Sequence, residues 1–525
     1  MAHGLPRETD TVIVGNGPSA LILSYILHGN IPCYDSSSPH PDRILHEKLL
    51  DHHHDDLLNV DIDALTTHFS ASRFSYSTQA LPINVLLDTI VRPLGETDDA
   101  QKKTCIKWRY DPSRAVPHVV IGNTKNAGGQ WVDDPVHASW DIGTLSYAGM
   151  LSLPGYTFDE HYKRRHGQTM PVFLRPSRRE VADYLAAYPD QVGIAKYIHN
   201  GQRIARVSRK HDGFYIASHG LVCQNLVLAS GIFDTIIPPP AMLGPLVSLN
   251  DDPLPSPDPI LVIGSGFSAA DVIISTPPDQ KIIHVFKWDP TTSPSPLRGC
   301  HRQAYPEYAG VYRRMKFVAL SSSNSRDRRP RMLRSQSNFE MSRDWDSTYE
   351  GLSNTVIIQV QRTSDGAGMV TFQRGDDPPF HRRVSSLSYV VGRRGSLCYL
   401  SEELRAEFLN TDCHMISGQT LRQQANEDLE VAPHVFVTGS LTGDSLIRFA
   451  YGGCAYAAGK IMRRAQDTES KGNGNGINAF VRRTNCRCET PSPKIPAMNG
   501  LDGHEASPIN LAKMCNGMPL DRRKD

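Results

Sequence analysis

The sequence predicts an α/β protein with two parallel sheets, and two glycine motifs support this prediction. Each motif has the spacing Gly-x-Gly-x-x-Ala, follows a short apolar run rich in β-branched residues, and opens an apolar helical segment. The first extends from Gly15 to Ala20 and the second from Gly264 to Ala269. They lie too far apart in the chain to be two halves of one nucleotide fold. We therefore expect two Rossmann-like, dinucleotide-binding domains, the second inserted into a discontinuous first.

The composition is that of a globular chain. Of its 525 residues, 39% are hydrophobic, 8% aromatic and 21% charged, which excludes whole-chain disorder and collagen-like repeats. The net charge is only +1, so we expect no nucleic-acid partner. We find no apolar run long enough to span a membrane and no secretory signal pattern. Ten scattered cysteines fit a reducing compartment, so we expect a cytoplasmic protein.

The first motif is typical of a turn that holds a pyrophosphate. Residues 11–17 read as a buried strand and its turn, residues 18–28 as a helix, and residues 31–35 as a second strand of a βαβ unit. The first glycine allows the tight turn, the second lets phosphates approach the backbone, and the third position must be small. The phosphate charge then meets free N–H groups at the helix N-terminus. The candidate binding residues are Gly15, Asn16, Gly17, Pro18, Ser19 and Ala20.

Asp35 is the candidate ribose ligand of this first site. It follows the glycine turn by about 20 residues, where an acidic side chain accepts hydrogen bonds from the ribose of an adenosine. The position near the N-terminus favours a permanently held flavin dinucleotide, FAD. The alternative is a glycine turn without a ligand.

The second motif predicts a site for a nicotinamide nucleotide. Its second strand, residues 282–287, ends in Lys287 and carries no carboxylate. A lysine attracts a 2′-phosphate that a carboxylate would repel, which favours NADPH over NADH. The alternative is that Lys287 is an ordinary surface lysine. The candidate binding residues are Gly264, Ser265, Gly266, Phe267, Ser268 and Lys287.

A third glycine turn lies near the end of the predicted folded region. The segment from Thr438 to Asp444 follows a strand at residues 435–439 and precedes a small-residue helix at about 446–464. In a flavoprotein with two dinucleotide domains, Gly439 and Asp444 would lie near the ribityl chain and ring of the flavin, at a helix N-terminus. The alternative is a plain turn with an aspartate N-cap.

These segments divide the chain into four parts. We expect the N-terminal part of the FAD domain, with an insertion, at 1–250, the NADPH domain at 251–395, the C-terminal part of the FAD domain at 396–466, and a disordered tail at 467–525. Eight prolines between residues 238 and 259 indicate a linker or long loop without regular structure.

Two other segments invite a functional interpretation. The arginine-rich segment 321–337 is interpreted as a basic loop, with phosphate contact or regulation as the alternative. We expect no metal site, because the consecutive residues of 52–56 do not share one face and Cys486 and Cys488 form an isolated pair.

The motifs together resemble those of the oxidative stress-induced growth inhibitor family, within the wider class B flavin monooxygenases. The resemblance spans roughly residues 10–465. Its glycine motifs are generic, whereas two further segments are more specific. The segments that carry it are Gly15-Asn-Gly-Pro-Ser-Ala20, Gly128-Gly-Gln-Trp131, Leu151-Ser-Leu-Pro-Gly-Tyr156, Gly264-Ser-Gly-Phe-Ser-Ala269, and Gly439-Ser-Leu-Thr-Gly-Asp444 with Arg448-Phe449.

This resemblance implies tightly bound FAD, NADPH as reductant, oxygen as co-substrate and a small-molecule substrate, with Trp131 near the flavin ring. In the wider class, reduced flavin adds oxygen to form a C4a-hydroperoxide that oxygenates the substrate. The protein supplies orientation, a dry pocket and electrostatics. No catalytic side chain is therefore identified from the sequence.

The sequence also departs from the class pattern. A Phe-x-Gly-x-x-x-His segment usually precedes the second glycine turn, but residues 243–250 contain no histidine. The Gly-Gly-x-Trp segment lies further downstream than usual, after a long insertion. Two alternatives therefore stay open. One is a flavin oxidase or dehydrogenase acting on an alcohol or sugar-like metabolite in a secondary-metabolite pathway. The other is a non-catalytic, flavin-bound regulatory protein.

Overall fold

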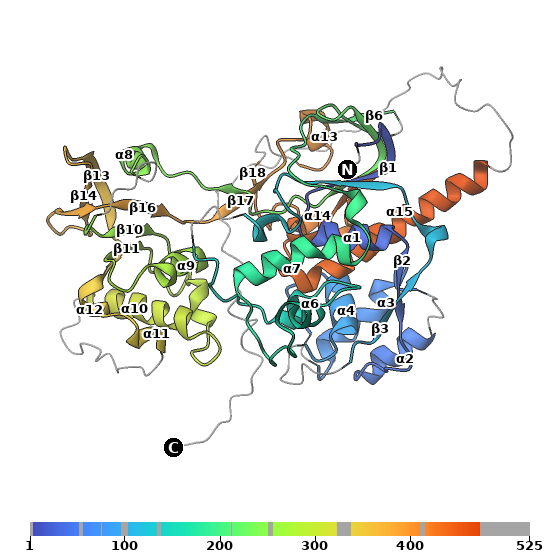
Figure 1. The fold of residues 1–525 in the computed structure, drawn as a ribbon, viewed down its shortest axis with the longest axis horizontal. Coiled ribbons are helices and arrows are strands. Elements are labelled where there is room, and N and C mark those ends of the chain that lie inside the picture. Colours follow the sequence, from blue (N-terminus) through green and yellow to red (C-terminus); the bar gives the residue numbers. More distant parts are fainter. Residues whose placement is uncertain are drawn as a thin grey trace, which may run out of the picture.

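The computed structural model shows two lobes joined by extended segments (Figure 1). The larger lobe contains both the N-terminal strand and the last helix, and the smaller lobe is made of the middle of the chain. The structure describes residues 4–51, 56–74, 76–95, 103–133, 138–211, 213–249, 256–322, 338–409 and 415–472.

The larger lobe is built on a sheet with the strand order of a doubly wound fold. Its parallel strands, in chain order, are β1 (Glu8–Val14), β4 (His118–Ile121), β5 (Ile198–His199), β8 (Leu221–Leu228) and β20 (Val435–Val437). Across the sheet they run β5-β4-β1-β8-β20, which is the order 3-2-1-4-5 of a dinucleotide-binding sheet. Antiparallel β19 (Glu430–Ala432) closes one edge, and β6 (Val207–Lys210) and β7 (Gly213–Ile216) form a meander with β8.

The smaller lobe repeats this arrangement. Its parallel strands, in chain order, are β10 (Ile260–Ile263), β11 (Ile282–Phe286), β12 (Tyr349–Ser353) and β16 (Ser386–Tyr389). They run β12-β11-β10-β16 across the sheet, the order 3-2-1-4. The antiparallel strands β13 (Val356–Arg362), β14 (Gly368–Gln373) and β15 (Phe380–Val384) precede β16, as a meander precedes β8 in the larger lobe. The α/β prediction with parallel sheets is confirmed.

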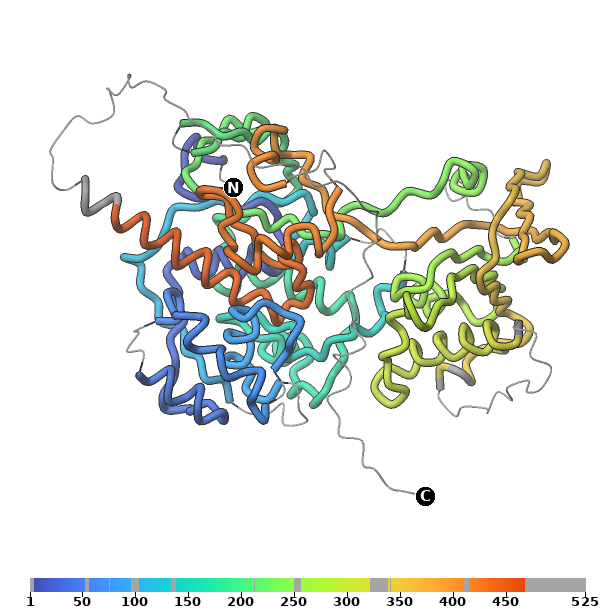
Figure 2. The backbone as a smooth tube through the Cα atoms, turned by 180° about the vertical axis from the view of Figure 1, so that it is seen from behind, coloured from blue at the N-terminus to red at the C-terminus, as the bar shows by residue number. Residues whose placement is uncertain are grey.

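The helices cover the sheets and form the cores. In the larger lobe, α1 (Pro18–Leu27) packs against the long α15 (Ala450–Gly472), whose course Figure 2 shows from behind. The buried apolar residues of both helices belong to one core cluster. In the smaller lobe, alternate residues of β11 face opposite sides: Ile282 packs with α9 (Phe267–Ser275) and α10 (Pro306–Ser322), and Ile283 packs with the antiparallel strands.

The remaining elements connect or flank these layers. The two chain segments that join the lobes pair as β9 (Thr235–Ile236) and β17 (Arg393–Ser396), with β18 (Met415–Ile416) beside β17. The α-helices among them are α5 (Ala148–Leu151), α6 (Phe158–His166), α7 (Arg178–Gln191), α8 (Gly244–Val247), α11 (Asn338–Met341), α12 (Trp345–Thr348), α13 (Glu402–Ala406) and α14 (Arg422–Glu427).

The expected βαβ unit of the N-terminus is wrong in one respect. The strand predicted at residues 31–35 exists as β2 (Asn30–Tyr34), but it pairs antiparallel with β3 (Ile106–Tyr110) and not with β1. The place beside β1 belongs to β4. Residues 30–110, with α2 (Arg43–Asp51), α3 (Ile62–Thr66) and α4 (Pro82–Val91), form an excursion between α1 and β4.

The two ends of the excursion lie side by side. The backbone N–H of Asp111 donates to the carbonyl of Gly29 at 2.7 Å. Gly29 has φ +104, and a Cβ there would lie 2.6 Å from the Asp111 oxygen. Only glycine permits this close approach.

The proline-rich segment and the last helix differ in part from what the sequence predicts. The proline-rich segment is not wholly irregular, because it contains α8, where Pro245 lies in the first turn and its missing N–H costs nothing. Helix α15 continues past residue 466 to Gly472. Residues 323–337, 473–525 and 52–55 lie outside the described residues. None of the described helices is long and apolar enough to cross a membrane.

Candidate functional site

The carboxyl ends of four parallel strands meet at one edge of the larger sheet. The N–H of Gly15, just after β1, donates to the carbonyl of Ile121 at 2.8 Å. On the other side of β1, the N–H of Ala229 donates to the carbonyl of Val14 at 2.9 Å, and the N–H of Thr438 donates to the carbonyl of Leu228 at 3.0 Å. Ligands of doubly wound proteins bind at this edge, where the strand order reverses on either side of the first strand.

Gly15 and Gly17 have different structural requirements. Gly15 has φ +114, and an added Cβ would clash with the carbonyl oxygen of Ala229, so the protein itself requires glycine there. Gly17 has φ −79, an ordinary value, and a Cβ there would meet only the Cα of Gly129, at 4.0 Å. The space in front of Gly17 is therefore open, as a backbone that admits a pyrophosphate requires.

The first turn of α1 is suited to an anion. Gly17 is the N-cap and no side chain caps the helix, Pro18 occupies the first turn, and no acidic residue lies there. The free N–H groups and the positive end of the helix dipole both favour negative charge.

Two further glycine segments close over this turn. The 3-10 turn Gly129–Trp131 lies against it: the N–H of Gly128 donates to the carbonyl of Asn16 at 2.8 Å, and a Cβ on Gly129 would lie 3.0 Å from the Cα of Gly17. Trp131 is half-buried against the core. A Cβ on Gly439 would clash with the Ser19 side chain, so the closing turn also reaches the start of α1.

The closing turn presents polar groups to the same edge. The Ser440 hydroxyl accepts a hydrogen bond from the N–H of Ile232 at 3.2 Å, which ties the turn to the segment after β8. The Thr438 side chain is fully buried, and its hydroxyl has no hydrogen-bond partner among the described residues. A buried hydroxyl without a partner costs free energy, so this atom is a candidate ligand contact.

The carboxylate of Asp444 already accepts hydrogen bonds from other residues of the protein. One carboxylate oxygen accepts from Arg422 Nη1 at 2.7 Å, and the other accepts from the N–H of Leu81 at 2.8 Å and from Asn84 Nδ2 at 2.7 Å. The side chain is only 4% exposed. Asp444 therefore joins the closing turn to the N-terminus of α4, and this geometry does not favour a free carboxylate for a flavin.

A second buried ion pair continues this junction. Arg448 donates to Asp88 of α4, and Arg92 donates to the same carboxylate at 3.2 Å. Arg92 also donates to the carbonyl of Ser152 at 2.9 Å, which in addition accepts from the Tyr451 hydroxyl at 2.8 Å. The Leu-Ser-Leu-Pro-Gly-Tyr segment around Ser152 thus connects the excursion to α15.

Asp35 and Asn16 do not take the places expected of them. Asp35 follows β2, outside the sheet, and the Ser37 hydroxyl and N–H donate to its carboxylate, which lowers its pKa. Asn16 Nδ2 donates to the carbonyls of Thr124 and Asn126 and to Asn200 Oδ1, at 3.2, 3.1 and 2.8 Å. Its side chain thus holds the loop after β4.

The smaller sheet carries an equivalent edge. The N–H of Gly264 donates to Val285 at 3.0 Å, and that of Val390 donates to Ile263 at 2.9 Å. Gly266 is the N-cap of α9, which no side chain caps, and the Ser295 hydroxyl donates to the carbonyl of Ser265 at 2.6 Å. Phe267 packs edge-on against Tyr308.

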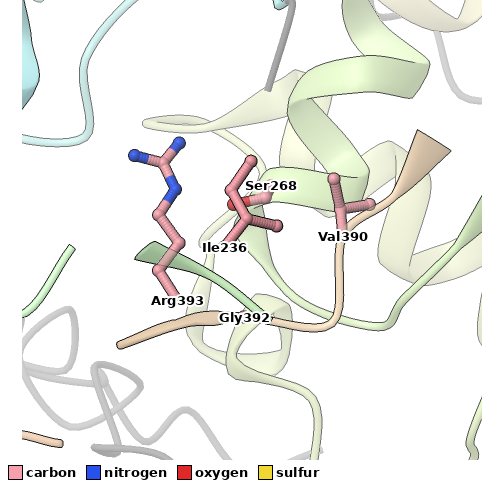
Figure 3. Close-up of a pocket in the computed structure, with 5 residues that line it drawn as sticks. All are labelled: Ile236, Ser268, Val390, Gly392 and Arg393. Atoms are coloured by element: carbon pink, nitrogen blue, oxygen red, sulfur yellow. The ribbon is translucent and has the colours of Figure 1, made fainter. Parts of the chain in front are cut away.

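A small pocket lies at this second edge, between α9, β16 and the joining strands. Figure 3 shows the residues that line it: Ile236, Ser268, Val390, Gly392 and Arg393. Lys287 follows β11 directly and is exposed, and its ammonium forms no hydrogen bond or ion pair with the described residues. The pocket residues after β16 were not predicted from the sequence. Comparing the segments that follow the two glycine turns could have indicated them.

A buried histidine supports the second glycine turn. His284 Nε2 lies 2.7 Å from the Gly264 carbonyl oxygen, and Nδ1 lies 2.8 Å from the Tyr349 hydroxyl. Burial lowers the pKa of His284 to about 4, so the ring is neutral at physiological pH. The network assigns the proton to Nε2, which donates to Gly264, while Tyr349 donates to Nδ1.

The two sheets define a doubly wound α/β protein with two equivalent edges, each carrying a glycine turn at the carboxyl ends of its parallel strands. Oxidative stress-induced growth inhibitor 1 of Mus musculus is 27% identical over 505 residues, which cover 86% of this chain and 95% of that protein. Oxidative stress-induced growth inhibitor 2 of Homo sapiens is 26% identical over 535 residues, which cover 89% and 96%. The resemblance to the oxidative stress-induced growth inhibitors that the motifs indicated is therefore confirmed.

Solved structures and family models complete these comparisons. A flavin-containing monooxygenase from Stenotrophomonas maltophilia aligns with a TM-score of 0.45 and 12% identity, over 87% of this chain and 99% of that chain. An ornithine N-hydroxylase from Kutzneria sp. 744, with reduced FAD, NADP+ and L-ornithine, has a TM-score of 0.45 and 12% identity, over 87% and 100%. No protein-family model matches the chain.

Proposed function

We propose that this protein is an FAD-dependent oxidoreductase that uses NADPH and oxygenates a small molecule, in the cytoplasm. The observation that carries the proposal is the uncapped N-terminus of α1, with an open Gly17, at the edge where the carboxyl ends of β1, β4, β8 and β20 meet. The buried Thr438 hydroxyl, which lacks a partner among the described residues, supports it. These features fit a bound dinucleotide.

The chain's own residues have distinct tasks in this proposal. Gly15 shapes the turn, and Gly17, Ser19 and Ala20 offer backbone N–H groups to the pyrophosphate. Gly439 and Trp131 lie beside the same turn, where they would flank the flavin. When bound, FAD accepts hydride and activates oxygen.

The second edge would hold the reductant. Gly264, Gly266 and Ser268 surround the uncapped start of α9, and the pocket beside Ser268 carries the cationic Arg393. Lys287 would attract the 2′-phosphate of NADPH. β11 is followed directly by Lys287, and not by a carboxylate that would repel this phosphate.

The first experiment records the visible spectrum of the purified protein. NADPH or NADH is then added to separate samples under anaerobic conditions. We expect a flavin spectrum that NADPH bleaches much faster than NADH. A yellow protein that NADPH does not bleach would contradict the use of NADPH and favour an oxidase or dehydrogenase. If it also oxidised no metabolite in extracts, a regulatory role would be favoured, as the names of the growth-inhibitor relatives suggest.

We expect Gly17→Ala to fold normally but to bind FAD at least about tenfold more weakly. The backbone at Gly17 suits alanine, and its Cβ would meet no protein atom closer than 4.0 Å, so only the ligand would be obstructed. The free energy of unfolding of the apoprotein should fall by about 1 kcal/mol at most, because alanine is a poorer N-cap than glycine.

FAD titration of the apoprotein, followed by flavin fluorescence, measures this effect. Gly149→Ala is the control, because a Cβ at Gly149 in α5 would meet no atom within 4 Å. Unchanged FAD affinity in the Gly17 variant would show that no pyrophosphate lies against this turn.

We expect Lys287→Ala to reduce the preference for NADPH over NADH by about tenfold or more, because one charge-assisted contact to the 2′-phosphate is lost. The ratio of the anaerobic bleaching rates with the two nucleotides measures it. Lys281→Ala is the control, because this exposed lysine precedes β11 at the opposite edge of the sheet. If the ratio is unchanged in Lys287→Ala, the assignment of Lys287 is wrong.

A further inference from the structure

The two parallel sheets can be compared residue by residue through their strand registers. In the larger sheet, Val14 precedes the glycine turn and pairs with Ile121, which accepts from the N–H of Gly15. In the smaller sheet, Ile263 precedes the glycine turn and pairs with Val285, which accepts from the N–H of Gly264. Ile121 and Val285 are therefore equivalent.

The other side of each glycine turn gives the same alignment. Val14 pairs with Leu228 and accepts from the N–H of Ala229, while Ile263 pairs with Tyr389 and accepts from the N–H of Val390. A Cβ on Gly15 would clash with the Ala229 oxygen, and a Cβ on Gly264 would lie 2.5 Å from the Val390 oxygen. Two independent strand neighbours thus support one alignment.

This alignment identifies the adenosine end of the first site. Lys287 lies two residues after Val285, and the residue two positions after Ile121 is Asn123. Asn123 therefore occupies the strand-end position that discriminates ribose from ribose phosphate in dinucleotide-binding sheets. Asp35 does not lie on this sheet.

The loop that carries Asn123 is held in a defined position. A Cβ on the preceding Gly122 would overlap the Asn16 side chain, and Asn16 in turn bonds Thr124 and Asn126 on the other side of Asn123. The Thr124 hydroxyl donates back to Asn16 Oδ1 at 2.8 Å. The Asn123 side chain is exposed and forms no hydrogen bond with the described residues. Its amide is thus available to a ligand.

We propose that Asn123, held in place through the Asn16 network, binds the adenosine ribose of FAD and that Asp35 has no part in this. The inference rests on the proposed FAD site. An amide both donates to and accepts from the ribose diol, whereas a carboxylate only accepts. Asn16 is a positioning residue here, and Asn123 is the binding residue.

The test is titration of the full-length apoprotein with FAD and, separately, with FMN, which lacks the adenosine half. We expect Asn123→Ala to lower the affinity for FAD about tenfold and to leave the affinity for FMN unchanged. Asn123→Asp, which keeps an acceptor for the ribose, should retain FAD affinity within about twofold, and so should the control Asp35→Ala. Thermal unfolding of each apoprotein should match the wild type.

Three results would overturn the inference. The first is an unchanged affinity for FAD in Asn123→Ala, and the second is an equal loss of affinity for FAD and for FMN in that variant. The third is a loss of affinity for FAD in Asp35→Ala. Failure of the wild-type protein to bind FAD would instead overturn the proposed function. The two failures are therefore distinguishable.

Discussion

We expect Gly15→Ala to lower the free energy of unfolding by at least about 3 kcal/mol, a loss large enough to endanger folding at physiological temperature. The variant needs a φ of +114, which an alanine adopts only under strain, and its Cβ would overlap the Ala229 carbonyl oxygen. That oxygen belongs to the backbone, so the turn and β8 must move apart. Chemical denaturation of the apoprotein measures the loss, and FAD binding should be lost with it.

Gly15→Ala and Gly17→Ala together separate two reasons for a glycine. The first substitution destabilises the protein even without a ligand, and the second acts mainly on ligand binding. Gly149→Ala again serves as the control for the loss of a glycine as such, because its Cβ would meet no atom within 4 Å. Equal stability of the Gly15 variant and the wild type would show that β1 and β8 do not approach as described.

We expect Asp444→Ala to destabilise the apoprotein by about 3–5 kcal/mol, the cost of breaking a buried ion pair by removing one partner. The side chain of Asp444 is 4% exposed and that of Arg422 is 18% exposed. The substitution also leaves the N–H of Leu81 and the Asn84 amide without their acceptor. The excursion would then lose its attachment to the closing turn. Denaturant unfolding without FAD measures this effect.

The control is Asp346→Ala, whose side chain is 96% exposed and whose pair with Arg314 spans 3.5 Å. Such a surface pair contributes about 0–1 kcal/mol. If Asp444→Ala instead left apoprotein stability unchanged and weakened only FAD binding, Asp444 would be a flavin ligand, as the sequence pattern indicates, and not an anchor for α4.

Several features could be predicted from local sequence. The runs before Gly15 and Gly264 are short, apolar and β-branched, and each leads into a helix, so strand, turn and helix follow from neighbouring residues alone. The closing strand and its glycine turn near Gly439 follow in the same way. Lys287 directly follows β11, as expected, because no excursion interrupts that unit.

The wrong pairing predicted for the strand before Asp35 has a physical cause. Residues 30–34 have the composition of a buried strand, and composition does not identify the partner of a strand. The pairing of β2 with β3 depends on residues 106–110, far along the chain, and on the close approach of Gly29 and Asp111. A spacing of about 20 residues predicts a ribose ligand only when the next strand in the chain is also the next in the sheet.

The sequence by itself therefore determined the two glycine turns, the α/β class and the lysine directly after β11, because these depend on residues that are neighbours in the chain. Only the tertiary structure decided that β4 lies beside β1, that Asp444 is bound by Arg422 and α4, and that Asn123 is equivalent to Lys287. Strand order and buried ion pairs join residues that are distant in the chain, and their free energy depends on packing that no local pattern contains.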